Sequence, residues 1–163
     1  MRFEREALKT GGSNSARGGY FVSRARTGAG GWRRRQLSGD DYYLDGVALN
    51  LHGFYAGVER LFELIAEVVD GALPQGENWH QVLLQQMASE VPHVRPAVIS
   101  ETTRDALDTY RGFRHIVRNV YTFKFDPAKM QRLVEEAPAV FCQVKVELLA
   151  FADFLEQRLA ADE

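Results

Sequence analysis

The segment LDGVALNLHGFYAGVERLFELIAEV, residues 44–68, is the clearest structural signal in this chain of 163 residues. Its apolar residues recur at alternating steps of three and four, the spacing that puts side chains on one face of an α-helix. This seam consists of Leu44, Val47, Leu51, Phe54, Val58, Leu61, Ile65 and Val68. Glu59 and Glu63 fall on other faces. The pattern predicts one long amphipathic helix that ends at Gly71, before the helix breaker Pro74.

Further helical patterns follow along the chain. A shorter apolar pattern predicts a helix over residues 79–87, and Ser100 is a favourable N-cap for a third helix. Asp126 caps a fourth helix with Pro127 at its first position, and Pro138 either interrupts that helix or begins another. The last apolar seam comprises Phe141, Val144, Leu148, Phe151, Leu155 and Leu159. Because no strand alternation persists, the sequence predicts an all-α bundle of four to five helices.

Composition divides the chain into two unlike pieces. Residues 1–39 carry nine Lys or Arg against two Glu and hold eight of the 14 glycines. The other 124 residues carry eleven Lys or Arg against twenty Asp or Glu. A segment rich in Gly, Ser and Arg and without periodicity buries too little apolar surface to offset its ordering entropy. We therefore expect a helical domain over residues 40–163 and a disordered basic tail over residues 1–39.

Three interpretations of this tail stay open. Its arginines, together with Tyr20, Phe21 and Trp32, could bind RNA through phosphate contacts and stacking. It could equally be a solvated tail without a role, or upstream sequence translated from a wrongly assigned start. We favour the last two over a functional arm, because GC-rich non-coding frames yield the Arg, Gly, Ala and Ser that dominate here.

The cysteine count and the length of the apolar runs exclude several classes of protein. The single cysteine, Cys142, excludes an internal disulfide framework and fits a reducing cytoplasm. Its apolar neighbours predict a small buried thiol. No apolar run approaches the roughly 20 residues of a membrane span, and the N-terminus lacks an apolar signal core. We expect a soluble, cytoplasmic protein without membrane contact. Its two wide seams can form either a core or an interface with a second copy, and the sequence alone does not separate these two roles.

One face of the helix predicted over residues 100–121 carries a polar stripe of Arg111, His115, Arg118 and Asn119. At about 100° per residue, the last three fall within about 80° of Arg111. An imidazole can accept or donate a proton near neutral pH, and arginine forks stabilise charge on phosphate oxygens. The stripe therefore predicts phosphate chemistry. The competing interpretation is a solvated face on which Arg111 pairs with Asp108.

The residues near this stripe and the remaining histidines indicate a function less clearly. Arg114 borders an apolar flank beside Tyr110 and Tyr121, where a structural role for its stem competes with a contact to RNA. We expect Tyr121 to belong to the core. The remaining histidines, His52, His80 and His93, have no partner at metal-ligand spacing. We therefore expect no metal site, and no function for these three histidines.

The stretch DTYRGFRHIVRNVYTFKFDPAKM, residues 108–130, resembles HEPN domains. More closely, it resembles the HepT-like ribonuclease branch, the toxin halves of toxin–antitoxin pairs with minimal nucleotidyltransferases. The flanking segments DDYYLDGVALNLHGFYAGVERLFELIA (residues 40–66) and FADFLEQRL (residues 151–159) are similar to the flanking helices of that group. The resemblance covers about residues 40–160 and implies an HEPN-like helical bundle.

The resemblance also implies an activity: a metal-independent endoribonuclease toxin without a cofactor, acting as a homodimer on RNA and paired with a minimal nucleotidyltransferase antitoxin. In such an enzyme His115 transfers protons, Arg111 and Arg118 hold the phosphate, and Asn119 orients a neighbouring group. Tyr121 is the nearest candidate for the tyrosine that partner antitoxins adenylylate.

This chain departs from the family motif, in which an Arg followed by Asn, Asp or His is separated from the His by four to six intervening residues, with a Tyr two residues after the His. Arg111 and His115 have three intervening residues. Arg118 and Asn119 match the opening pair, but Phe123 and Phe125 stand where the His and Tyr would fall. His115 lies upstream instead. Either this branch uses a shifted Arg/His set, or the chain is a catalytically degenerate HEPN bundle that binds a nucleotidyltransferase partner or a nucleotide.

Overall fold

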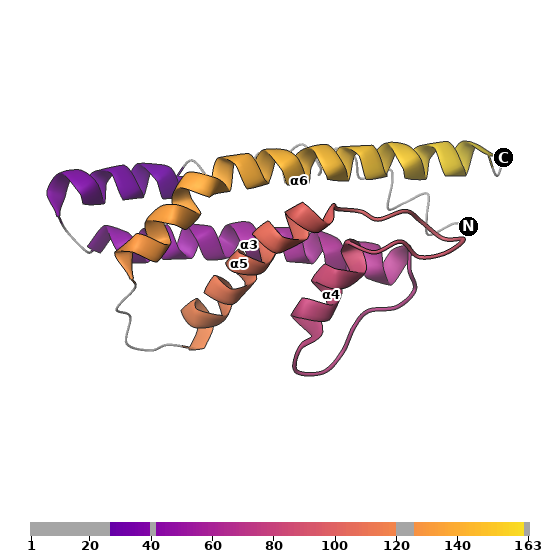
Figure 1. Ribbon diagram of the computed structural model, residues 1–163, viewed down its shortest axis with the longest axis horizontal. Coiled ribbons are helices and arrows are strands. Elements are labelled where there is room, and N and C mark those ends of the chain that lie inside the picture. Colours follow the sequence, from indigo (N-terminus) through magenta and orange to yellow (C-terminus); the bar gives the residue numbers. More distant parts are fainter. Residues whose placement is uncertain (1–26, 40–41, 120–125, 162–163) are drawn as a thin grey trace.

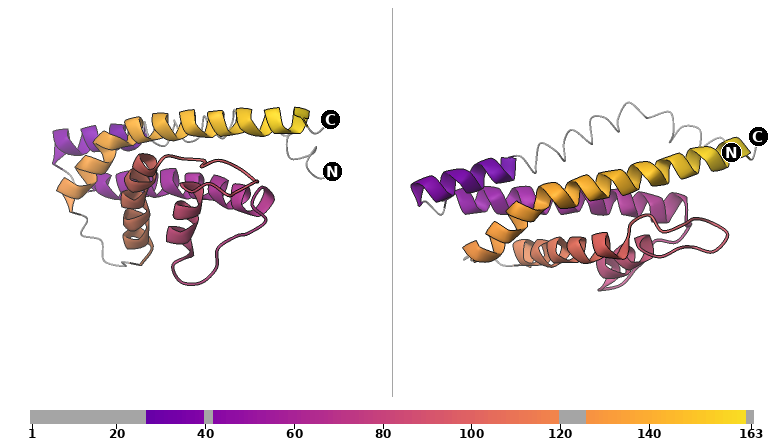
Figure 2. Two further views of the ribbon diagram at one scale, coloured as in Figure 1. Left: turned by 45° about the vertical axis from the view of Figure 1, so that its right-hand side comes forward. Right: turned by 45° about the horizontal axis from the view of Figure 1, so that its top comes forward.

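The computed structural model describes residues 27–39, 42–119 and 126–161. Within these ranges it contains five helices and no strand, which confirms the predicted all-α class. One helix covers residues 27–38, and the others are α3 (Tyr42–Val68), α4 (Trp79–Met87), α5 (Glu101–Asn119) and α6 (Pro127–Ala161). The long helices α3 and α6 lie side by side, and α4 and α5 pack together on one side of them (Figures 1 and 2). Helix α3 contacts all three other labelled helices.

Large apolar side chains of α3 and α5 form the centre of the core. Phe54 packs edge-on against Tyr110 with 5.3 Å between the ring centroids, and the Tyr110 hydroxyl donates a hydrogen bond of 2.8 Å to the backbone carbonyl of Leu133. This bond satisfies a buried phenol and joins α5 to α6. Burial of the ring raises the pKa of Tyr110 above its ordinary value.

The buried face of α3 follows the predicted seam through Val58 and then turns. Beyond that residue the buried side chains are Phe62 and Ala66, whereas Val68 of the predicted seam is exposed. A helix with 3.6 residues per turn drifts away from a strict alternation of threes and fours, so the face in contact with the core moves around α3. The same drift brings Glu59 inside, where only 3% of it is exposed.

The helix ends follow local sequence signals. Ser100 caps α5, since its Oγ accepts a hydrogen bond of 3.2 Å from the backbone N–H of Thr103. Asp126 caps α6 in the same way through the N–H of Ala128, at 3.0 Å. After α3, Gly71 takes φ +65°, a left-handed conformation that stops helices at little cost in glycine. These three predictions are confirmed.

Helix α6 continues through Pro138 rather than ending there. A proline inside a helix removes one backbone hydrogen bond and pushes its ring against the preceding turn, which bends the helix. Figure 1 shows such a bend in the orange part of α6. The two predicted segments on either side of Pro138 are therefore one helix.

The helix over residues 27–38 was not expected, because its composition predicts disorder. It packs on the first turns of α3 through two glycines. A Cβ atom at Gly31 would lie 3.1 Å from Cγ2 of Val47, and one at Gly28 would lie 3.6 Å from Cβ of Asn50. The glycines allow this close approach, and Trp32 is buried with 5% exposure. Tertiary packing thus outweighs a low helix propensity. The rest of the predicted tail, residues 1–26, lies outside the described residues.

The segment between α4 and α5 is held by the buried side chain of Arg95. Its guanidinium forms two bonds with the carboxylate of Asp70, at 2.5 and 2.7 Å, and also donates to the carbonyls of Gln86, Ser89 and Pro96. From the far end of α6, Arg158 donates to the carbonyls of Val94 and His93. Every contact of Arg95 is internal, so this ion pair is structural.

Cys142 is exposed on α6, so the prediction of a buried thiol is wrong. Its position puts it on the outer side of the helix, beside the exposed Val146. In the described part of the chain, no helix combines the length and the apolar character that crossing a bilayer requires.

Candidate functional site

Helix α5 carries the predicted polar stripe, and the structure describes two of its four side chains. His115 is exposed. Arg111 is partly buried, and its Nε donates a hydrogen bond of 2.7 Å to the Asp108 carboxylate, one turn earlier. That bond raises the pKa of the Arg111 guanidinium above its ordinary value. The ion pair with Asp108 that the competing interpretation expected for Arg111 is therefore present. The Arg111 side chain is nevertheless partly exposed, one turn before His115.

The other predicted residues cannot be placed in the same detail. Arg118 and Asn119 belong to the last turn of α5, but their side chains lie outside the described part of the structure. Tyr121 lies outside it entirely, as do Phe123 and Phe125. By helical spacing, Arg118 follows Arg114 and His115 along the same side of α5.

A buried ion cluster joins α3, α4 and α5 next to this stripe. Glu59 of α3 is 3% exposed. One of its carboxylate oxygens lies 2.6 Å from Nδ1 of His80 on α4, and the other lies 3.0 Å from Nη2 of Arg114 on α5. Nη1 of Arg114 in turn lies 3.3 Å from Nε2 of His80. We call these three residues the Glu59 cluster.

The geometry of the Glu59 cluster favours one tautomer of His80. Arginine has no lone pair to offer, so a hydrogen bond between Arg114 and Nε2 requires that Nε2 accept it. In the tautomer that permits this bond, the ring proton is on Nδ1 and is donated to Glu59. The unprotonated Nε2 of that tautomer faces the arginines of α5, and the ring stacks on Trp79 with 3.6 Å between centroids.

Tyr55 and Arg111 belong to the same electrostatic environment. Burial is the largest cause that raises the pKa of Tyr55, and the negative charge of Glu59 raises it further, against the opposing influence of Arg111 and Arg114. The Tyr55 phenol therefore stays neutral at physiological pH. Glu59 and Tyr55 also contribute to the raised pKa of Arg111. The polar stripe and the Glu59 cluster are therefore neighbours in one charged region.

Two residues of this region have partners that the sequence did not indicate. Arg114 is paired with a carboxylate of another helix. His80 contacts both Glu59 and Arg114. Neither pairing leaves a sequence signal, because Glu59, His80 and Arg114 are far apart along the chain and meet only when three helices pack. One hint was available: Glu59 borders the apolar seam, where a carboxylate needs a partner.

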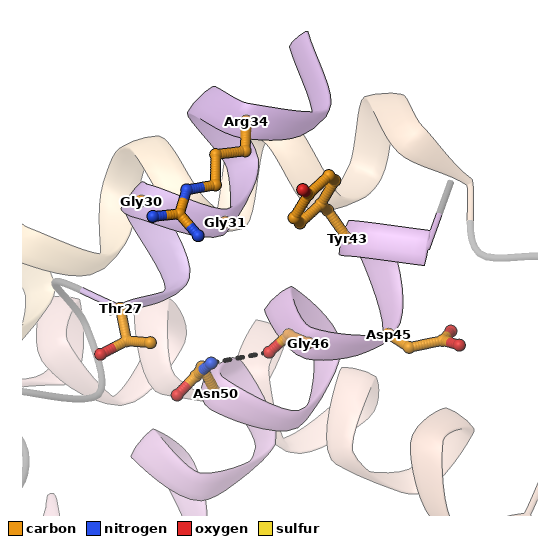
Figure 3. A pocket seen from close by; sticks show the side chains of 8 residues that line it. All are labelled: Thr27, Gly30, Gly31, Arg34, Tyr43, Asp45, Gly46 and Asn50. Carbon is orange, nitrogen blue, oxygen red and sulfur yellow. Dashed lines mark hydrogen bonds between the residues drawn. The ribbon is translucent and has the colours of Figure 1, made fainter. Parts of the chain in front are cut away.

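Two cavities lie away from α5. One, of about 470 Å³, lies between the helix over residues 27–38 and the start of α3. In Figure 3 the Arg34 side chain extends over it and Asn50 donates a hydrogen bond of 2.7 Å to the Gly46 carbonyl, while Asp45 points away. The other, of about 340 Å³, is lined mainly by apolar residues of α6 and of the segment before α5. Neither is lined by the polar stripe.

Comparison with known proteins gives one match. A family model described as HepT-like protein matches residues 46–155, from the first turns of α3 to the last part of α6. The match includes the polar stripe and all three residues of the Glu59 cluster. No curated protein and no solved structure matches the chain.

Proposed function

The chain belongs to the HepT-like protein family, and we propose that it is a metal-independent endoribonuclease, the toxin of a pair whose antitoxin is a minimal nucleotidyltransferase. The observation that carries this proposal is the surface of α5, where the exposed His115 follows Arg111 by one turn and Arg118 lies one turn further. We propose that the protein acts in the cytoplasm as a homodimer, so that two such stripes can contribute to one site.

The chemistry assigned to the polar stripe is transesterification of RNA. The 2′-hydroxyl loses a proton and attacks the adjacent phosphorus, and negative charge builds on the non-bridging oxygens. His115 transfers protons, and the arginines stabilise the charge through fixed guanidinium forks. Asn119 orients one of these groups, and Tyr121 is the residue that the antitoxin would adenylylate.

A direct test is incubation of the purified protein with total cellular RNA in EDTA. We expect the wild-type protein to produce fragments with 2′,3′-cyclic phosphate ends. His115→Ala should lower the rate by about 100-fold or more, the usual contribution of a proton-transfer group, without changing the circular dichroism spectrum. The matched control is His93→Asn, which removes another exposed histidine and suits the positive φ of 63° at that position.

A second function is favoured by one specific observation. Arg111 is paired with Asp108 and Arg114 with Glu59, and Phe123 and Phe125 replace the family's His and Tyr. In a catalytically degenerate bundle these ion pairs would serve stability only, and the protein would bind a nucleotidyltransferase partner or a nucleotide. The same experiment separates the two functions: a folded wild-type protein that leaves RNA intact in EDTA supports the binding module and contradicts the nuclease.

A further inference from the structure

The Glu59 cluster is partly exposed, whereas the ion pair of Arg95 and Asp70 is fully buried. The Arg95 side chain is fully buried, and its bonds go to one carboxylate and three carbonyls. Arg114 is 14% exposed and His80 is 22% exposed at the side chain. Nε of Arg114 is buried and has no hydrogen-bond partner among the described residues. A buried donor without a partner is unusual in a purely structural ion pair, and the exposed part of the Arg114 guanidinium can receive an oxygen atom from a ligand.

The orientation of His80 is that of a general base. A buried carboxylate holds its Nδ1–H at 2.6 Å, which fixes the ring and stabilises the positive charge that the ring gains when Nε2 takes a proton. Nε2 faces α5, where Arg114 donates to it at 3.3 Å. His115 is exposed, and it is the histidine to which the proposed function already gives a proton-transfer role.

We propose that His80 is a second proton-transfer residue of the RNA site, with Arg114 as its phosphate ligand and Glu59 as its positioning residue. This inference rests on the proposed ribonuclease function and extends it to three helices. A non-bridging phosphate oxygen takes the hydrogen bond that Nη1 of Arg114 otherwise donates to His80, while Nη2 stays paired with Glu59. This releases Nε2 of His80 for the 2′-hydroxyl of the substrate.

Two protons are transferred in the proposed step, one to His80 and one from His115. Nε2 of His80 accepts the proton of the 2′-hydroxyl while the 2′-oxygen forms a bond to phosphorus. The bond between phosphorus and the 5′-oxygen breaks, and the leaving 5′-oxygen takes a proton from the imidazolium of His115. The products are a 2′,3′-cyclic phosphate and a free 5′-hydroxyl. His80 is left protonated between the Glu59 carboxylate and the bound phosphate.

The charged groups around His80 are compatible with this role. Glu59 and Tyr55 face the cluster from α3, and Arg114, Arg111 and Asp108 face it from α5. Among the described residues, the two arginines are balanced by the two carboxylates, and Tyr55 is neutral. A phosphate bound at Arg114 would add negative charge that compensates a proton on His80, which couples base catalysis to substrate binding.

The test is the pH dependence of kcat/KM on an RNA that the wild-type protein cleaves. A neutral base and a protonated acid give a bell-shaped profile. His80→Asn retains a donor near the position of Nδ1 and removes Nε2. We expect a loss of about 100-fold at the optimum and no rise of rate with pH on the acid side. In His115→Ala, kcat/KM should instead no longer fall at alkaline pH.

Glu59→Gln tests the role of Glu59 in positioning His80. It also provides a test of the Glu59 cluster if His80→Asn does not fold. A neutral amide stabilises an imidazolium less than a carboxylate does. The acid limb should therefore move to lower pH, with a loss of about 10-fold at the optimum. The matched control is Asp70→Asn, which breaks the other buried carboxylate–arginine pair. It should lower the melting temperature and leave the shape of the profile unchanged.

The outcomes are distinguishable. A wild-type acid limb in folded His80→Asn, or in folded Glu59→Gln, would overturn the role of the Glu59 cluster while the ribonuclease function stands. A wild-type protein that does not cleave RNA, or cleavage that is indifferent to His115→Ala, would overturn the proposed function and this inference with it.

Discussion

At the scale of single residues, the polar region of α5 consists of arginines whose charges are partly neutralised. Arg111 is bonded to Asp108 at 2.7 Å, and Arg114 is bonded to Glu59 at 3.0 Å. The two pairs differ in kind. Asp108 is about half exposed and can be displaced, since solvent-exposed pairs contribute little to stability. Glu59 is buried, and a charge left there without its partner is costly.

This difference leads to a prediction for Asp108→Asn. Removal of the carboxylate frees the Arg111 guanidinium for phosphate, so the affinity for RNA should rise by about threefold at low salt, and the gain should vanish in high salt. Fluorescence anisotropy with labelled RNA measures this, in a His115→Ala background that prevents cleavage. Glu136→Gln is the matched control, because it removes the same charge from an exposed pair with Arg132 on α6. An equal gain in both variants would mean that only net charge matters.

At the scale of helices, local signals and long-range packing were predictable to different degrees. The caps at Ser100 and Asp126 and the stop at Gly71 depend on residues within one turn, so the sequence alone was sufficient for them. The cluster of Glu59, His80 and Arg114 depends on how three helices meet, and no spacing along the chain encodes it. The stripe of Arg111 and His115 was predictable because both lie on one helix.

The helix over residues 27–38 also depends on a long-range contact that the sequence alone does not encode. A substitution at Gly31 tests this contact. Valine there would press against Val47, since even its Cβ would lie 3.1 Å from that side chain. We expect Gly31→Val to detach this helix and to cost about 1–3 kcal/mol of stability. Trp32 would then become exposed, and its fluorescence would shift to the red in a Trp79→Phe background.

The control for this prediction is Gly30→Val. It makes the same change of residue type one position earlier in the same helix, where a Cβ would meet nothing within 4 Å. Its fluorescence should remain that of the parent protein. Because valine favours a helix more than glycine does, a red shift of equal size in Gly30→Val would contradict the importance of the close contact between Gly31 and Val47.

At the scale of the whole molecule, stability should fall at alkaline pH because the core contains two tyrosines. Burial raises the pKa values of Tyr55 and Tyr110 above the ordinary value of 10.0. The unfolded chain therefore releases these protons at a lower pH than the folded chain. Stability is fully present below about pH 10 and decreases above it, by up to about 1.4 kcal/mol per pH unit for each tyrosine.

Urea unfolding of the wild-type protein and Tyr55→Phe at pH 8, 10 and 11 tests this. The free energy of unfolding should fall less steeply above pH 10 in the variant, because one of the two titrating groups is gone. Identical slopes in the two proteins would assign the alkaline loss to other groups. The comparison uses the slope of the free energy of unfolding against pH. A change in stability at pH 8 that the substitution causes therefore does not affect it.

The buried side chain of Arg95 has a mechanical consequence. Segments without regular secondary structure commonly act as hinges between helices. Here the connection between α4 and α5 is fastened at both ends, by Arg95 to Asp70 and by the amides of Val98 and Ile99 to the carbonyl of Met87. The connection is therefore held in place by contacts within the fold. It is poorly suited to act as a hinge that separates α4 from α5.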